Sequence, residues 1–438
     1  MSAQRKTKAC KYTVAEFFCG CGGFTHGFCK SGRFRAVLGN DIKYFALETF
    51  RNNHTLGGHE PIIIKQDIRT VPDKTIQEML ANQGVQQLDC LIGGPPCQGF
   101  SQMRRMVERS KSSIVGFGGY NRLDQDPRND LVLRFLEIAA VLQPKVVIIE
   151  NVPQFLRHYH NGEVGGIARQ VQDILNKLGY DVCYGVVNAA DYGVPQLRER
   201  TIIIASRIGN IEIPPATHEA SGSTLLPWIT VRDALGDIPQ VVNPINDYSS
   251  PPENAFQRAM RTSKHFPPLH ITRTYSSNIV SIIRRMRPGE TWDEASARER
   301  ALCDKLIEEV KRKGESSEFA KNRLIAEGRI LPSFYKKYYW SAYTRLAWAS
   351  PALTITANAN FLGSGRFTHP EEDRGITIRE AARLQSFDDA FEFITTEHDH
   401  SPPSIGIAMD MIGEAVPPIL AQRIAEHIAK SLDLAQGA

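Results

Sequence analysis

Three motifs, far apart in the sequence, contain residue types suited to nucleophilic and acid–base chemistry. Cys97 follows two prolines in the run GGPPCQGFS at 93–101, and a thiol fixed at the edge of an α/β sheet is well placed as a nucleophile. Glu150 ends the apolar run VVIIE, where a buried carboxyl can donate a proton. Arg198 and Arg200 are two positions apart, so on a strand both would face one side. The simpler alternative for Cys97 is a buried, unreactive thiol.

Glycines and acidic residues end the first three predicted strands and suit a nucleoside cofactor. The run FFCGCGG at 17–23 lets the backbone approach a ligand, although Thr25 stands where the nicotinamide fingerprint has its last glycine. Asp41 could accept hydrogen bonds from ribose hydroxyls. Asp67 could accept from an adenine amino group, and Ile68 could pack on the adenine ring. Each acidic residue alone is more often a solvated strand end, but the three strand ends together indicate a nucleoside.

Alternating strand and helix patterns must position these residues. Five β-rich runs occur at 15–20, 35–41, 61–67, 88–94 and 145–152, and helical patterns occur at 44–53, 74–83, 131–142 and 167–178. This alternation predicts an α/β fold with a mostly parallel sheet and helices on both faces. After a further strand at 201–206, seven prolines between 214 and 252 indicate a boundary to a less regular second domain. Residues 418–434 are expected to form a helix.

The positive charge is concentrated in one part of the chain. The 438 residues contain 52 Lys+Arg and 48 Asp+Glu, but residues 256–345 alone hold 19 and 10 of these. The remaining residues therefore have 33 basic and 38 acidic side chains. Several aromatic residues share the basic segment, a composition suited to nucleic acid, although a solvated basic helical face is the alternative.

Other features of the composition exclude some classes of protein. No apolar run approaches the ~18–20 residues that span a bilayer, which excludes a transmembrane protein. The basic start of the chain lacks the apolar core of a secretory signal, and eight cysteines are too few for a disulfide scaffold, so we expect a reducing compartment. Cys19 and Cys21 form a C-x-C pair rather than the C-x-x-C pairs typical of zinc sites, and we expect no metal.

The order of the motifs resembles that of the DNA cytosine-5 methyltransferases. PPCQGFS, ENV and QLRER are similar to the fourth, sixth and eighth motifs of that family, and FFCGCGG is similar to the first. Asp41 and Asp67 fall where the second and third motifs place acidic residues. Residues 379–387 and 411–418 are similar to the ninth and tenth motifs. The resemblance extends from residue 14 to about residue 430, with a variable gap where the family has its target-recognition region.

The resemblance implies a fold and a division into domains. It implies an α/β fold with a Rossmann-like S-adenosylmethionine-dependent methyltransferase sheet and a smaller, irregular target-recognition domain. The catalytic, cofactor-binding domain would comprise residues 1–207 and 408–438, with the tail helix packing back on it. The target-recognition domain would comprise residues 208–407.

The resemblance also implies a reaction and its catalytic residues. In the family's mechanism a thiolate, matched by Cys97, adds to carbon 6 of a flipped-out cytosine, and carbon 5 then takes the methyl group. Glu150 matches the protonated carboxyl beside ring nitrogen 3. Arg200 matches the contact to the 2-oxo group, and Arg198 matches an adjoining support or phosphate contact.

S-adenosylmethionine is the cofactor that the resemblance implies. The residues that match its contacts are Phe18, Gly20, Gly22, Gly23, Asp41, Ile42, Asp67, Ile68, Pro95, Leu131, Glu414, Ala415 and Val416. Glu414 replaces the family's usual Asn near the methionyl end, where a carboxylate would repel the donor's carboxylate or pair with its ammonium group. We expect Glu414 either to weaken donor binding, to favour a related donor with altered charge, or to turn aside without effect.

Duplex DNA is the implied partner. Residues 101–129 resemble the mobile catalytic loop of the family, with an ordinary surface loop as the alternative. The predicted DNA contacts are Ser101, Arg104, Arg105 and Gln196, together with Lys336, Lys337 and Arg345, the last three as phosphate contacts by composition only. We expect a monomeric bacterial modification enzyme, cytoplasmic and nucleoid-associated, without membrane contact and with any cognate restriction endonuclease acting separately.

Two other functions stay open at this point. A tRNA cytosine methyltransferase would share the fold, but the Cys-Phe-Thr signature of that branch does not occur in the sequence. A catalytically silent DNA-binding relative usually lacks the catalytic Cys, Glu or Arg, and all of these are present here.

Overall fold

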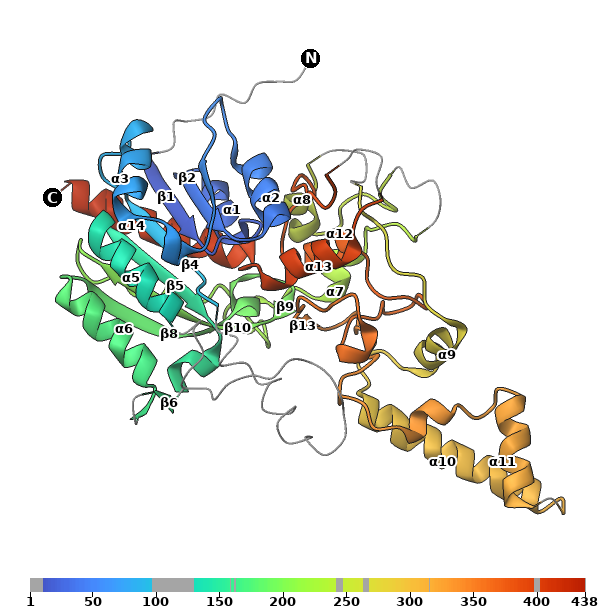
Figure 1. Cartoon of the computed structure of the whole chain (residues 1–438). Helices are drawn as coiled ribbons and strands as arrows, with labels where there is room; N and C mark the ends of the chain where they lie inside the picture. The colour runs from blue at the N-terminus through green and yellow to red at the C-terminus, as the bar shows by residue number, and fades with distance from the viewer. Residues whose placement is uncertain are drawn as a thin grey trace. The chain divides into compact units, whose positions relative to one another are not determined.

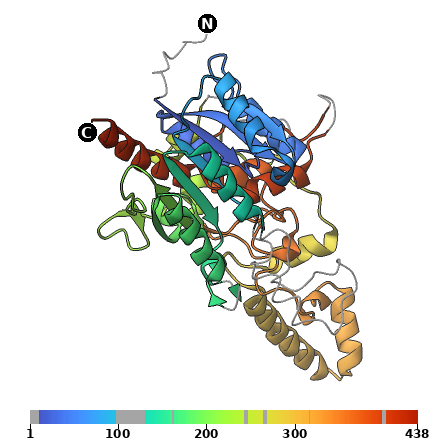
Figure 2. The same ribbon diagram turned by 60° about the vertical axis from the view of Figure 1, so that its left-hand side comes forward.

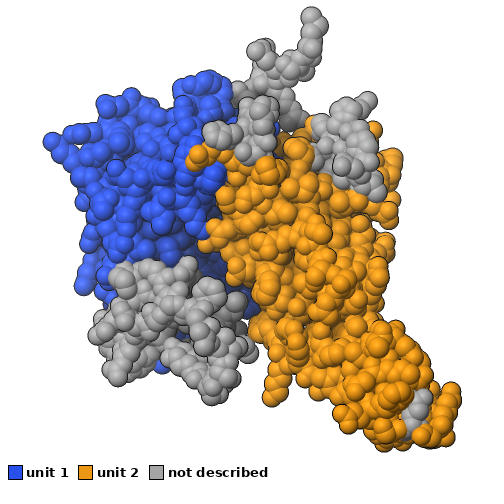
Figure 3. All heavy atoms as spheres, turned by 45° about the vertical axis from the view of Figure 1, so that its right-hand side comes forward, with its two compact units in different colours: residues 1–228, 391–394, 415–438 blue, residues 229–390, 395–414 orange. Residues whose placement is uncertain are grey.

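The computed structural model describes residues 11–96, 130–157, 159–160, 163–241, 247–262, 268–314, 316–397 and 402–437 (Figure 1). The predicted nucleophile Cys97 and the predicted DNA contacts Ser101, Arg104 and Arg105 lie outside the described residues. Two compact units make up the chain (Figure 3). The sheet unit is Met1–Trp228 with Phe391–Ile394 and Ala415–Ala438, and the second unit is Ile229–Ala390 with Thr395–Glu414. The domain boundaries expected at 207/208 and 407/408 stay a prediction.

Seven strands form the sheet of the sheet unit, in the order β3-β2-β1-β4-β5-β10-β8. They are β1 (Tyr12–Phe17), β2 (Phe34–Asp41), β3 (Ile62–Lys65), β4 (Cys90–Gly93), β5 (Val146–Asn151), β8 (Asp181–Asn188) and β10 (Glu199–Ser206). The first five in this order are parallel, whereas β10 pairs antiparallel with β5 and β8. The predicted mostly parallel α/β sheet is confirmed. The apolar patterns do not predict β8, because this edge strand is half exposed along most of its length.

Helices cover both faces of this sheet (Figures 1 and 2). They are α1 (Gly23–Lys30), α2 (Tyr44–His54), α3 (Asp73–Asn82), α5 (Asp130–Leu142), α6 (Gly166–Lys177) and α14 (Pro418–Gly437). Successive strand residues face opposite sides, so β1 contributes Phe17 to a core with α3, α5 and α6, and Val14 to a core with α1 and α14. The sheet unit also has the short elements η1 (Ile68–Thr70), η3 (Pro153–Arg157), β6 (Tyr159–His160), β7 (Glu163–Val164), η4 (Ala189–Tyr192), β9 (Gln196–Leu197), β11 (His218–Glu219) and β12 (Leu226–Pro227).

Helix α14, predicted at 418–434, packs closely against α1. A Cβ at Gly27 would lie 2.3 Å from the Pro418 carbonyl oxygen and 2.4 Å from the Ala421 Cβ, so this approach requires glycine. Near the other end of α14, one carboxylate oxygen of Asp433 accepts from Lys11 Nζ (2.8 Å) and from the Tyr12 hydroxyl (2.7 Å). The beginning of β1 and the end of α14 are therefore joined.

The second unit consists mainly of short helices joined by long loops. Its elements are α7 (Val231–Leu235), α8 (Ala255–Met260), α9 (Ser277–Arg285), α10 (Trp292–Lys311), α11 (Ser317–Ala326), η5 (Pro332–Tyr335), β13 (Ala352–Leu353), η6 (Leu362–Ser364), α12 (Ile378–Leu384) and α13 (Ile405–Glu414). Helices α10 and α11 form a hairpin that projects from the rest of the unit (Figure 1) and shares a small core around Cys303 and Leu324. Among the described residues of both units, no helix has the length and apolar character needed to cross a membrane.

Candidate active site

The turn after β1 brings the backbone to the carboxyl edge of the sheet. Phe18, Gly20 and Gly22 have left-handed φ values of 56°, 51° and 87°. A Cβ at Gly22 would lie 2.5 Å from the ring of His54, so both conformation and space require glycine there. The Gly22 N–H closes the turn by donating to the Cys19 carbonyl at 2.8 Å. The FFCGCGG run thus forms a tight turn, while its contact with a cofactor stays a prediction.

Asp41, at the end of β2, is held by three backbone N–H groups. Its Oδ2 accepts from Gly20 at 2.9 Å, and its Oδ1 accepts from Ile42 at 2.7 Å and Lys43 at 2.9 Å. A carboxylate has about four lone-pair directions, so Asp41 keeps capacity for a further donor such as a ribose hydroxyl. The adjacent Ile42 side chain is 67% exposed and offers apolar surface beside Asp41. This pair has the chemistry that an adenosine requires.

Asp67 and Ile68, which follow β3, have different environments. Asp67 accepts from the Arg69 backbone at 3.0 Å and pairs with its guanidinium at 2.5 Å, and these contacts lower the pKa of Asp67. Ile68 is only 2% exposed and belongs to the core that includes α5. Ile68 therefore offers little side-chain surface, and its packing on an adenine ring stays a prediction.

Strands β4 and β5 run side by side and place the proline motif next to Glu150. Gly93 is in register with Ile149 on the neighbouring parallel strand. A Cβ at Gly94 would lie 3.1 Å from Glu150 Oε2, so the backbone before the prolines passes directly beside this carboxyl group. The Asn151 side-chain amide donates to the Pro95 carbonyl at 3.2 Å. The two contacts fix the segment that leads to Cys97 against the strand that carries Glu150.

Arg200 and Arg198 are brought close to Glu150 in different ways. Arg200 Nε pairs with Glu150 Oε1 at 2.7 Å, and both side chains are mostly buried. Arg198 lies between β9 and β10, is 1% exposed, and donates from Nη2 to the Ala415 carbonyl at 3.1 Å. Burial, together with the like charge of Arg200, lowers the pKa of Arg198, and Glu150 opposes this shift. Burial favours the supporting role of Arg198 over a phosphate contact.

The other predicted residues of the sheet unit offer little surface to a ligand. Leu131 is 8% exposed and Val416 is 6% exposed, and both belong to apolar cores. Ala415 is half-buried. Gln196, a predicted DNA contact, has no exposed surface, so the structure does not favour that role for its side chain. Glu414 belongs to the second unit, where it is exposed at the end of α13.

The three basic residues predicted to contact phosphates differ in exposure. Lys336 and Lys337 are exposed after η5, as such contacts require. Arg345 is 5% exposed, donates to the Ile283 and His369 carbonyls, and pairs with Asp373. The prediction of Arg345 as a phosphate contact is therefore corrected, because its guanidinium is committed to the interior of the second unit.

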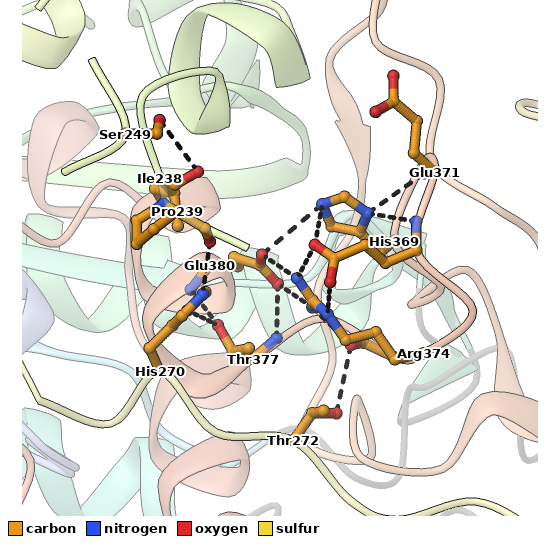
Figure 4. A network of polar contacts seen from close by, with 12 residues as sticks. Ile238, Pro239, Ser249, His270, Thr272, His369, Glu371, Arg374, Thr377 and Glu380 are labelled. Atoms are coloured by element: carbon orange, nitrogen blue, oxygen red, sulfur yellow. Dashed lines mark hydrogen bonds and ion pairs between the residues drawn. The ribbon is translucent and has the colours of Figure 1, made fainter. Parts of the chain in front are cut away.

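A cluster of His369, Glu372 and Glu380 in the second unit has ligand types and spacing that a metal ion could use (Figure 4). Arg374 pairs with both carboxylates, at 2.7 Å in each case. His369 Nδ1 accepts from the backbone N–H groups of Glu371 and Glu372, so its proton is on Nε2, the nitrogen that faces the carboxylates. Because Arg374 already neutralises the acids and Nε2 has no free lone pair, this cluster is an ion-pair network.

Three polar residues near the site were missed by the sequence reasoning. Asn40 donates to the Ile64 and Gln66 carbonyls and ties the ends of β2 and β3 together, and Asn151 holds Pro95. Glu16, the next-to-last residue of β1, is 3% exposed. Their common signal is a polar residue inside or directly after an apolar strand, which costs stability unless it has a specific partner.

The family assignment comes from comparison with known proteins. A sequence profile described as C-5 cytosine-specific DNA methylase matches residues 12–430. The chain belongs to that family. The type II methylase M.HgiDII of Herpetosiphon aurantiacus is 30% identical, and the match covers 96% of each chain. The type II methyltransferase M.AgeI of Thalassovita gelatinovora is 29% identical, and the match covers 94% of this chain and 98% of that protein.

Solved structures agree with the family at the level of the fold. A prophage-encoded protein of Escherichia coli matches with a TM-score of 0.63 and 21% identity, over 96% of this chain and 99% of that one. The methyltransferase EhMeth of Entamoeba histolytica matches with a TM-score of 0.53 and 15% identity, over 96% of this chain and 99% of that one. The resemblance inferred from the motifs is confirmed, and the chain is a DNA cytosine methyltransferase.

Proposed function

We propose that the chain transfers a methyl group from S-adenosylmethionine to carbon 5 of a cytosine flipped out of duplex DNA, through a covalent adduct of Cys97 at carbon 6. The observation that carries this proposal is the preformed pair of Glu150 and Arg200, 2.7 Å apart, with Glu150 beside the backbone of Gly94, the residue directly before the Pro-Pro-Cys run. Carbon 5 of cytosine is too weakly nucleophilic to react unaided, and addition of a thiolate to carbon 6 makes it an enamine carbon.

Glu150 and Arg200 have the chemistry to stabilise this addition. A proton shared between the Glu150 carboxyl and ring nitrogen 3 accepts the electron density that the thiolate pushes into the ring. Arg200 uses Nε for Glu150 and Nη1 for the Glu199 carbonyl, so among the described residues its Nη2 has no partner and can donate to the 2-oxo group. After methyl transfer a base removes the carbon-5 proton, the ring regains its double bond, and Cys97 leaves as the thiolate.

The carboxyl edge of the sheet fits the proposed donor. S-adenosylmethionine supplies an electrophilic methyl group when bound. Asp41 has acceptor capacity left for a ribose, Ile42 offers exposed apolar surface for an adenine ring, and Asp67 follows the next strand. A Cβ at Gly20 would have nothing within 4 Å, so this turn offers open backbone for the methionyl part to approach. Glu414, Ala415 and Val416 are proposed at its far end, with the carboxylate of Glu414 as the family's exception.

Duplex DNA is proposed to meet the second unit at exposed basic and aromatic residues. Lys336 and Lys337 are exposed, and Tyr338 and Trp340 beside them are 37% and 39% exposed. Ammonium groups next to rings suit a phosphate backbone and its bases. Ser101, Arg104 and Arg105 are proposed to act from the loop after Cys97. Since the two relatives named above are a type II methylase and a type II methyltransferase, we also propose that the chain protects DNA from a separate restriction endonuclease.

Mass spectrometry of nucleosides tests this function. DNA from cells that express the chain should contain 5-methylcytosine, and DNA from cells that express Cys97→Ser should not. Denatured wild-type protein should stay attached to duplex DNA that contains 5-fluorocytosine at the target site, because the adduct cannot release a carbon-5 fluorine. If only tRNA is modified, the substrate is tRNA and not DNA. If the added mass is not that of a methyl group, the donor is not S-adenosylmethionine. If the protein binds DNA and neither product forms, it is a catalytically silent DNA-binding module.

A further inference from the structure

Arg366 of the second unit is a half-buried cation without an anionic partner. Its guanidinium makes no ion pair within the described residues, whereas the buried Arg345, Arg374 and Arg383 each pair with at least one aspartate or glutamate. A charge that is partly removed from water without compensation costs stability, so packing of the unit alone does not account for this side chain. Arg366 is therefore available for an acceptor that the chain itself does not supply.

The indole ring of Trp340 orients this guanidinium. Arg366 Cζ lies over the Trp340 ring, 5.2 Å from its centroid, and Trp340 is 39% exposed. The contact occupies one face of the planar guanidinium, and the N–H donors point outward in the plane of the group. Burial lowers the pKa of Arg366, and the hydroxyl of the half-buried Tyr339 opposes this shift. Stacking thus fixes the direction of the donors and leaves most of them for another acceptor.

The backbone that carries the two side chains is packed against the interior of the unit. Phe367, directly after Arg366, is 1% exposed. A Cβ at Gly365, directly before Arg366, would lie 3.2 Å from the Phe367 ring, so glycine allows this close turn. The Trp340 carbonyl accepts from the Trp292 N–H at 2.7 Å at the beginning of α10. Side chains that are oriented before binding lose less conformational entropy when they bind, which favours a contact with one defined geometry.

We propose that Arg366, oriented by Trp340, is a specificity-determining residue that reads a guanine in the major groove of the DNA target by donating to its O6 and N7 atoms. The inference rests on the proposed contact between duplex DNA and the second unit. The two acceptors of guanine lie in one plane and match the paired donors of a guanidinium. A phosphate offers a similar pair of oxygens, but exposed lysines such as Lys336 and Lys337 suffice for that contact, whereas a base edge must be met in one geometry.

The proposed contact predicts a change at one position of the recognition sequence. Arg366→Met keeps the length of the side chain but removes its charge and its donors. The preference for guanine at that position should therefore fall by about tenfold or more, while the preferences at the other positions remain. Trp340→Leu keeps an apolar side chain but removes the aromatic face that orients the guanidinium, so it should relax the same position by about two- to fivefold.

The experiment determines which sequences each variant methylates. Wild type, Arg366→Met, Trp340→Leu and the control Arg329→Gln are incubated with S-adenosylmethionine and a random-sequence DNA library, and sequencing of the methylated cytosines gives the preference at every position. Arg329 is exposed in the same unit but pairs with Glu327 at 3.7 Å, so its replacement should leave the preferences unchanged. Replacing the guanine by 7-deazaguanine, which lacks the N7 acceptor, should slow wild type by about three- to tenfold and should not slow Arg366→Met further. Circular dichroism melting checks that each variant folds.

The outcomes separate this inference from the proposed function. If Arg366→Met slows methylation of every sequence alike, and reduces the slope of log DNA affinity against log salt by about one, Arg366 contacts a phosphate and the guanine assignment is wrong. Unchanged preferences in Arg366→Met, or an equal effect of 7-deazaguanine on this variant and on wild type, also overturn it. If Arg366→Met does not fold, Trp340→Leu decides, and preferences that Trp340→Leu leaves unchanged overturn the inference. If wild type methylates no DNA sequence, the proposed function is wrong and the inference fails with it.

Discussion

Glu16 of the sheet unit and Glu380 of the second unit are similarly buried, at 3% and 1% exposure, but their surroundings shift their pKa values in opposite directions. Glu380 accepts a bidentate pair of hydrogen bonds from Arg374 and one from the Thr377 backbone. Although burial opposes its ionisation, Arg374 and the nearby histidines hold the pKa of Glu380 at about 2, whereas the pKa of Glu16 is about 8. The protein neutralises Glu380 with Arg374, whereas within the described residues the hydrogen-bond partner of Glu16 is the neutral Thr25.

The same contrast appears among neighbouring groups of each unit. In the second unit, Arg383 is fully buried between Asp237 and Asp389, with nitrogen–oxygen distances of 2.8 Å and 2.6 Å. In the sheet unit, Asp41 is held only by backbone N–H groups in its described contacts and retains acceptor capacity. A fixed arginine partner favours a rigid interior, while backbone donors orient a carboxylate without neutralising it.

The largest expected difference between the two acids is in stability. Glu380→Gln leaves the buried Arg374 with one carboxylate fewer and should lower the free energy of unfolding by about 3–5 kcal/mol. At about pH 4.5, where little proton uptake accompanies folding, Glu16→Gln replaces a protonated acid by a neutral acceptor and should change it by less than about 1 kcal/mol. Urea denaturation of the two matched variants measures both values. Equal losses would show that the two carboxylates are structural in the same sense.

Arg200 tests whether the pairing of Glu150 is catalytic rather than structural. Arg200→Gln removes the donor that faces the proposed 2-oxo position and should lower kcat by about 10²–10³-fold, with DNA affinity within a few-fold of wild type. Single-turnover methylation and DNA binding measure these quantities. Arg423→Gln, on the surface of α14 where Arg423 pairs with Glu426, is the control and should leave both unchanged. A variant of Arg200 that unfolds, or that keeps its rate, would exclude this role.

Stability should depend on pH with opposite sign in the two units. Burial lowers the pKa of His270 and of His369 below the ordinary 6.5. Below pH ~6.5 these histidines bind a proton in the unfolded chain but not in the folded protein. As pH falls, the free energy of unfolding should therefore decrease by up to about 1.4 kcal/mol per pH unit for each histidine. The raised pKa of Glu16 acts the other way, because the folded state holds a proton between pH 4.5 and about 8 that the unfolded state has lost, and stability decreases as pH rises through this range.

Variants separate the two sides of this pH profile. His270→Gln should flatten the acidic side of a plot of unfolding free energy against pH, and Glu16→Gln should flatten the side that extends toward pH 8. Hydrogen bonds identify the tautomer at stake, since His270 Nε2 donates to the Pro239 carbonyl and its Nδ1 accepts from Thr377 (Figure 4). If either variant changes the opposite side of the profile, the assignment of these protons is wrong.

Exposed lysines of the second unit should act on DNA binding alone. The double variant Lys336→Ala with Lys337→Ala should weaken DNA binding by about three- to tenfold near 0.1 M salt and reduce the slope of log affinity against log salt by about 2. Lys74→Ala with Lys177→Ala, exposed on α3 and α6, removes the same charge and is the control. Salt titrations monitored by fluorescence anisotropy measure the slopes. Equal losses in both double variants would mean that only net charge matters.

The smallest expected effect concerns Glu414. Replacing its carboxylate by the family's amide in Glu414→Asn should strengthen binding of S-adenosylmethionine by about two- to fivefold, because repulsion of the donor's carboxylate is removed. Calorimetry gives the affinity and mass spectrometry gives the added group, which should remain a methyl. An unchanged affinity would show that Glu414 turns away from the donor.

Sequence reasoning found the fold and most of the sheet-edge residues because both have local signals. The five parallel strands are apolar runs, and glycine or acidic residues directly follow them, so Asp41 and Glu150 can be placed at the carboxyl edge without coordinates. It does not predict side-chain burial. Ile68 and Arg345 looked available for contact, but packing by distant segments encloses them. The exposure of a side chain depends on packing against residues that are distant in the sequence, and the composition of a segment does not show this packing.

The sequence also did not predict the hydrogen-bond partners of buried polar groups. Nothing in the sequence shows that Glu16 would meet Thr25, and only Thr25 was noticed, as the residue in place of the fingerprint's last glycine. The pairing needs the turn at Gly20 and Gly22 to bring the first residues of α1 back over β1. It is a consequence of backbone conformation and not of residue type.

The hydrogen bonds that join the beginning of β1 to the end of α14 affect when the sheet unit can fold during protein synthesis. Lys11 and Asp433 are 422 positions apart, and α14 covers the face of the sheet that carries Val14, together with Phe24 and Phe28 of α1. A ribosome adds about 5–20 residues per second, so on the order of half a minute passes between synthesis of this face and synthesis of α14, the helix that covers it. Throughout that interval the growing chain exposes apolar surface that chaperones can bind, and a chain that stops before residue 418 cannot complete the sheet unit. A methyltransferase with a complete sheet unit can therefore form only after translation has passed α14.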